Sequence, residues 1–110
     1  MNADALRTLN EIKKNGWFRL STAMGVSALH PRIYGYSGWS EVRKIGEFKT
    51  YVLDAVQGQS WAEIEVIRAL NDDKAFEAFS KLYHLEMFDE WEIRERVVEF
   101  RLVKSKEIGE

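Results

Sequence analysis

The sequence contains no cysteine, only one proline, and no apolar run near the length needed to cross a membrane. Without cysteine, the chain cannot form disulfide bonds, thiolate nucleophiles or cysteine-ligated zinc sites. A spanning helix needs ~20 apolar residues, and a signal peptide needs an apolar stretch near the N-terminus; the chain shows neither. These features predict a protein of the reducing cytoplasm that does not enter a membrane.

What the sequence does contain is typical of a folded domain. The 110 residues are 45% hydrophobic and 13% aromatic, which argues against disorder, and the length suits a single domain spanning residues 1–110. The net charge is −2, with eight Lys/Arg and five Asp/Glu in residues 1–55, and eight and thirteen in residues 56–110. Proteins that hold nucleic acid non-specifically are usually basic overall, so nucleic acid is an unfavoured partner.

Two helices are predicted in the first half of the chain. Residues 3–15 carry apolar side chains at helical spacing, and Gly16 follows as a stop. The same periodicity recurs from Trp39 to Val56 and favours a second helix, which Gly46 could interrupt. A strand is less favoured there, because Asp54 would then share a face with apolar residues.

Capping patterns predict two further helices. Ser60 and Glu63 form a capping box before an apolar stripe, and residues 71–73 (Asn-Asp-Asp) form a turn and a cap before another amphipathic segment. The run from Ser37 to Ile45 resembles that from Gln59 to Ile67. We interpret this likeness as two helices that begin with the same capping chemistry, not as a repeat.

Extended structure is predicted in three places. Residues 17–21 and 32–36 favour short strands, and Glu90–Val103 favours a long strand with a bulge at 97–98, with a charged helix as the alternative. The long strand needs a partner, either in residues 17–36 or in a second subunit. The expected fold class is therefore α+β: a small, predominantly helical single domain whose helices pack on one face of a small antiparallel sheet that includes the long C-terminal strand.

No motif specifies a reaction. Leu20–Tyr34 has some features of a helix-turn-helix, but its second helix would run through Pro31. Arg32–Trp39 partly matches the aromatic strand of RNA-recognition modules, yet it comes too early in the chain for that fold. His84 with the nearby acids lacks a known metal-ligand spacing. The sequence thus predicts no catalytic residue, metal ligand or cofactor, and leaves enzymatic activity open.

The aromatic content suggests two functions. Fourteen Trp, Tyr and Phe residues are many for so small a core, and such rings anchor interfaces, which favours a non-catalytic interaction protein that forms a homodimer or binds another protein. The alternative is a binder of small molecules, or a modest enzyme, with an aromatic-lined pocket around residues 17–39. The candidate ligand-binding or partner-binding residues are Trp17, His30, Arg32, Tyr34, Tyr36 and Trp39.

Overall fold

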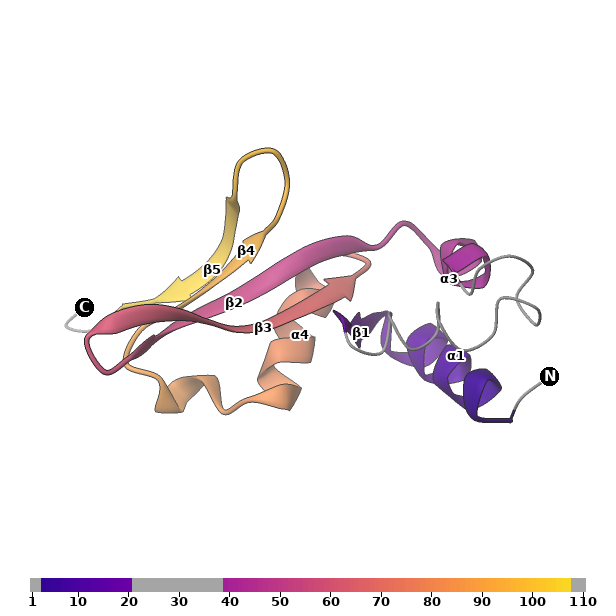
Figure 1. The fold of residues 1–110 in the computed structure, drawn as a ribbon, viewed down its shortest axis with the longest axis horizontal. Helices are drawn as coiled ribbons and strands as arrows, with labels where there is room; N and C mark the ends of the chain where they lie inside the picture. Colours follow the sequence, from indigo (N-terminus) through magenta and orange to yellow (C-terminus); the bar gives the residue numbers. More distant parts are fainter. Residues whose placement is uncertain (1–2, 21–38, 108–110) are drawn as a thin grey trace.

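The computed structural model describes residues 3–20 and 39–107 of the chain. Along the sequence (Figure 1) its elements are α1 (Ala3–Asn15), β1 (Trp17–Arg19), α3 (Trp39–Ile45), β2 (Lys49–Gln57), β3 (Ser60–Ala69), α4 (Asp72–Leu82), the 3-10 helix η1 (Leu85–Met87), β4 (Trp91–Glu95) and β5 (Arg101–Lys106). No helix in the described ranges is long and apolar enough to span a bilayer.

The strands form one antiparallel sheet in the order β1-β3-β2-β4-β5. β2 and β3 make a long hairpin closed by Gly58 and Gln59, and the loop between β4 and β5 projects from the body of the molecule (Figure 1). Leu53 and Asp54 of β2 pair with Glu65 and Glu63 of β3. Ile64 is therefore an extra residue in β3 and forms a bulge.

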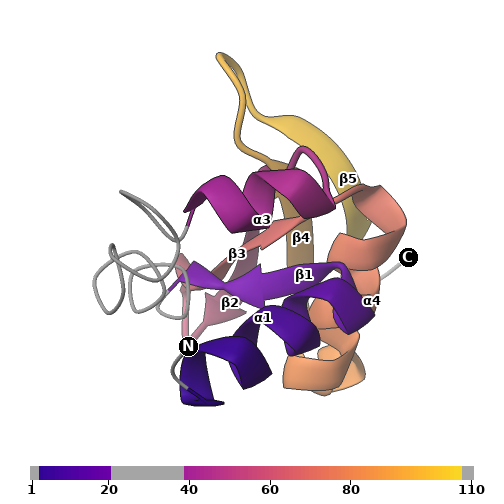
Figure 2. The same ribbon diagram turned by 90° about the vertical axis from the view of Figure 1, so that its right-hand side faces the viewer.

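Two apolar clusters lie on opposite faces of the sheet. The larger joins α4 to residues of β2, β3 and β4 such as Leu53 and Ile93, and the smaller joins α1, α3, Phe18 and Phe48. Trp17 packs against the first cluster while its neighbour Phe18 belongs to the second, as the alternation of side chains along a strand requires. Figure 2 views the molecule from the end that holds α1 and α3, with α4 to one side.

The helices α1 and α4 confirm the sequence prediction, and their local chemistry explains why. α1 ends at Gly16, which takes a φ of 75° and donates its backbone N–H to Ile12 O at 2.9 Å. α4 begins after Asn71, whose side-chain oxygen accepts the backbone N–H of Lys74 at 2.9 Å. Both signals act within one helical turn, so they are visible in the sequence.

The expectation of a predominantly helical domain is wrong, because the strands hold more of the described residues than the α-helices do. The helix expected from Trp39 ends at Ile45, and the chain then continues as β2. Gly46 marks the break: a Cβ there would lie 2.6 Å from Leu70 Cδ2. β2 lacks a polar–apolar alternation because its middle is covered on both faces, so its apolar residues imitated a helical pattern.

Two more expectations about the sheet are corrected. The segment from Ser60 is strand β3, not a capped helix, since it pairs along its length with β2. The C-terminal segment is extended, but it is two strands, β4 and β5, and the change of face near Val97 is the connection between them. The helices also lie on both faces rather than one. The strand expected at residues 32–36 lies outside the described residues.

We predict that Gly58→Ala lowers the free energy of unfolding by roughly 1–2 kcal/mol, the cost of a side chain at positive φ. Gly58 has a φ of 67° in the two-residue β2–β3 loop, and no atom lies within 4 Å of the position of an added Cβ, so the cost is confined to the backbone. Urea denaturation measures it. Gln59→Ala is the matched control, and an equal loss in the control would contradict the assignment.

Candidate functional site

The structure places two of the six residues predicted as a binding site. Trp17 lies on β1 and packs against the α4 cluster, and its indole Nε1 is buried without an acceptor among the described residues. Trp39 is the first residue of α3. The other four (His30, Arg32, Tyr34 and Tyr36) lie outside the described ranges. Their convergence into one site therefore stays a prediction.

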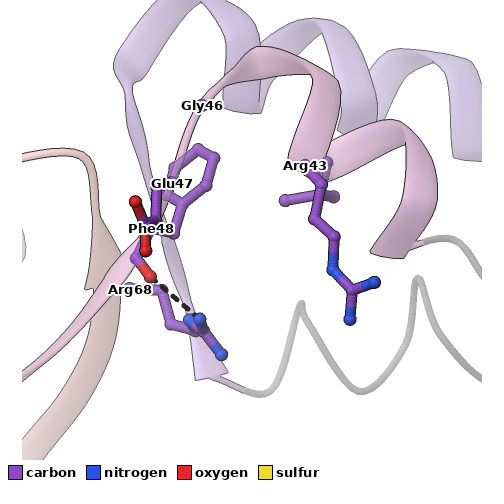
Figure 3. A pocket seen from close by; sticks show the side chains of 6 residues that line it. Arg43, Gly46, Glu47, Phe48 and Arg68 are labelled. Carbon is purple, nitrogen blue, oxygen red and sulfur yellow. Dashed lines mark hydrogen bonds between the residues drawn. The ribbon is translucent and has the colours of Figure 1, made fainter.

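A cavity of about 750 Å³ lies where α3 is followed by β2 (Figure 3). Its described lining consists of Val42, Arg43, Gly46, Glu47, Phe48 and Arg68. Arg68 donates from Nη2 to the backbone oxygen of Phe48 at 2.9 Å, and Arg43 extends from α3 on the other side of the space (Figure 3). The cavity is charged rather than aromatic, and none of the six predicted residues is in this described lining.

Much of the sheet face opposite α4 is left uncovered by the helices of the described ranges. α1 and α3 pack on this face only near Phe18 and Phe48. Beyond that point the strand register places on it a set of residues that we call the open sheet face: Asp54, Val56, Trp61, Glu63, Glu92, Arg94 and Leu102, together with Phe100 from the β4–β5 loop.

Three carboxylates form a row across the open sheet face. Asp54 on β2 is directly opposite Glu63 on β3 and Glu92 on β4, and like charges in such positions repel. Arg94 forms an ion pair with Glu92, and Arg96 donates to Glu63 at 2.8 Å. Asp54, between them, makes no hydrogen bond or ion pair with a described residue, and burial raises its pKa above the ordinary value.

Large apolar side chains lie beside this row. Trp61, Phe100 and Leu102 are 46%, 49% and 54% exposed. The guanidinium carbons of Arg94 and Arg96 lie 6.0 and 5.5 Å from the centroid of the Phe100 ring, within the range of a cation–π contact. The open sheet face therefore combines acids, arginines and exposed rings, the residue types that occur in protein interfaces.

A second polar cluster lies on the α4 side of the sheet. Tyr51 donates from its hydroxyl to Asp72 at 2.9 Å, and Arg101 donates to Asp72 at 2.5 Å and to Glu95 at 2.6 Å. The hydrogen bond from Arg101 lowers the pKa of Asp72, while burial raises the pKa of Tyr51. These bonds join the start of α4 to β2, β4 and β5, so the cluster acts as a structural tie.

The sequence did not point to the open sheet face. Its residues were assigned to helices or to one long strand, which placed Trp61 on an inward stripe. One available signal of a strand was the alternation of Glu63 and Glu65 with the apolar residues between them, although the bulge at Ile64 places only Glu63 on the open sheet face. The residues around His84 have no known metal-ligand spacing. No group of three metal-binding side chains occurs in the part of the chain that the structure describes.

Comparison with known proteins gives no functional information: no family model matches the chain, and no curated protein or solved structure shows significant similarity to it.

We predict that Asp72→Asn lowers the free energy of unfolding at pH 7 by about 1 kcal/mol, a small effect because the carboxylate is partly solvated. Because folding lowers the pKa of Asp72, its carboxylate stabilises the folded state at pH values above the unfolded pKa of about 3.9. This stabilisation is lost as the pH falls through the pKa of the folded state. The difference between variant and wild type should therefore shrink as the pH falls below about 4, as measured by urea denaturation at pH 7 and at several lower pH values.

The control for this prediction is Asp73→Asn, which removes a carboxylate from the same first turn of α4 without breaking an ion pair among the described residues. If this control loses as much stability as Asp72→Asn, the effect belongs to the helix dipole and the tie to Arg101 is refuted.

Proposed function

We propose that this chain is a non-catalytic interaction domain that forms a homodimer by docking two copies of the open sheet face. The observation that carries the proposal is the exposure of Trp61, Phe100 and Leu102 on a part of the sheet that no described helix covers. Apolar side chains gathered on one face gain free energy when they are removed from water, and aromatic and arginine side chains are the usual anchors of interfaces.

The charge pattern favours a second copy as the partner. Val52 lies two residues before Asp54 on β2, on the same face, and it pairs with Arg94. The row of acids at Asp54 is therefore next to the row that holds Arg94. A twofold axis between these rows and parallel to them brings the acidic row of each copy onto the arginine row of the other. Arg94 of one copy would then lie over Glu92 of the other, and Asp54, which makes no hydrogen bond or ion pair with a described residue, would lie one strand away from that Arg94.

The free edge of β5 is a less suitable surface for self-association. Arg101, Lys104 and Lys106 lie along this strand. Antiparallel pairing of two copies of β5 brings these like charges close together, and basic residues of this kind protect the edges of natural sheets. Docking through the face avoids this repulsion.

Two further features support the proposal. Two of the three carboxylates on the open sheet face are held by arginines, so they are poorly placed to act as an acid and a base. The absence of cysteine is compatible with a reducing environment, and we propose the cytoplasm as the location of the dimer.

We predict that the wild-type protein sediments as a dimer in analytical ultracentrifugation and that Trp61→Ser combined with Leu102→Ser sediments as a monomer, with its circular dichroism unchanged. Both side chains are about half exposed, so truncation should weaken dimerisation more than folding. The matched control is Met87→Ser, a 78% exposed apolar residue on η1, which should stay dimeric. A wild-type protein that stays monomeric over a wide concentration range refutes the homodimer.

We also predict that Asp54→Asn has opposite effects on folding and on dimerisation. Because burial raises the pKa of Asp54, its charged form is disfavoured in the folded monomer, and the amide should increase the free energy of unfolding at pH 7. The same change removes a negative charge one strand away from Arg94 of the second copy, so the dimer dissociation constant should rise. Urea denaturation of dilute protein and ultracentrifugation measure the two effects. A gain in stability with unchanged dimerisation would remove Asp54 from the interface.

A further inference from the structure

A second, smaller cavity lies on the opposite side of the sheet from the open sheet face. It has a volume of about 310 Å³, opens to the surface and is bordered by α4, η1, β4 and β5. Its described lining consists of Phe76, Ser80, Tyr83, Leu85, Glu86, Trp91, Lys104 and Lys106. This size is at the lower end of the range for small-molecule sites, about 300 Å³ and above.

The wall of the cavity is aromatic. The rings of Phe76 and Trp91 are nearly parallel, at 18°, with their centroids 6.3 Å apart. Trp91 is only 5% exposed, and its buried indole Nε1 has no hydrogen-bond acceptor among the described residues. A buried indole N–H normally finds an acceptor. The cavity therefore offers a flat apolar surface made by two aromatic rings.

Two ammonium groups belong to the same cavity. In the β4–β5 register Lys106 is opposite Trp91 and Lys104 is opposite Ile93, so both project from the sheet face that carries Trp91. The Nζ atom of Lys104 lies 3.8 Å from the centroid of Phe76, and that of Lys106 donates to the backbone oxygens of Glu86 and Phe88. Neither ammonium has a carboxylate partner among the described residues.

The remaining polar groups of the lining do not neutralise this charge. The hydroxyl of Tyr83 donates to Glu65 at 2.8 Å, away from the lysines. The carboxylate of Glu86 is 77% exposed, and its Oε1 atom lies 3.6 Å from Nδ1 of His84. The cavity thus combines an aromatic wall with two cations whose charge is not balanced by a described carboxylate, which favours an anion with an apolar body.

We propose that this cavity binds a small organic carboxylate. Its apolar body packs against Phe76 and Trp91, and its carboxylate accepts hydrogen bonds from Nζ of Lys104 and of Lys106. The site is independent of the proposed dimer, because its residues lie on the other face of the sheet.

The test follows the indole N–H resonance of Trp91 by ¹⁵N–¹H NMR, assigned by its absence in Trp91→Phe, during titration with 4-phenylbutyrate. The matched probe is 4-phenyl-1-butanol, which has the same apolar body without the charge. The expected result is a saturable shift of the Trp91 resonance, with the carboxylate binding at least about tenfold more tightly than the alcohol. Equal affinities, or no saturable shift with the carboxylate, overturn the proposal.

Lysine variants make the test specific. Lys104→Met keeps the aliphatic chain over Phe76 but removes the ammonium, and should weaken 4-phenylbutyrate binding by about tenfold without changing the binding of the alcohol. Lys81→Met on α4 removes a lysine that pairs with Glu77 outside the cavity and should leave both affinities unchanged. If both variants weaken binding equally, the effect is one of overall charge and the proposed site is wrong.

Discussion

Strand β2 is the element on which the rest of the structure depends. It is hydrogen-bonded to β3 on one edge and to β4 on the other, and three consecutive residues, Tyr51, Val52 and Leu53, are at most 1% exposed. A strand that is paired on both edges and buried through its middle leaves little freedom to its neighbours. Its register therefore decides which side chains of β3 and β4 share a face, and it places Asp54 between two other carboxylates.

The two faces of this sheet carry different chemistry. On the α4 side, apolar packing is supported by the hydrogen bonds from Tyr51 and Arg101 to Asp72, which hold the start of α4 against β2 and β5. On the other side α1 and α3 cover one end only, and beyond them aromatic rings, arginines and acids lie at the surface. One face thus provides stability and borders a small cavity, while the other leaves large apolar side chains exposed.

Two similar stretches of sequence show how far local patterns can be trusted here. The segment that begins at Trp39 forms helix α3, as its capping pattern indicates, whereas the segment that begins at Trp61, with nearly the same pattern, lies in strand β3. The capping box of Ser60 and Glu63 contributes about 1 kcal/mol to a helix start. Pairing along the length of β2 and burial of Ile67 outweigh that preference.

The sequence by itself determined the features that depend on contacts within one helical turn. It indicated α1 with its stop at Gly16 and α4 with its cap at Asn71. The alternation of apolar residues indicated, in addition, the extended character of the C-terminal segment. Only the tertiary structure decided the strands β2 and β3, the turn between β4 and β5, and the residues of both candidate sites. A strand is stabilised by partners distant in sequence, and the side chains that meet on a sheet depend on a register that no single segment contains.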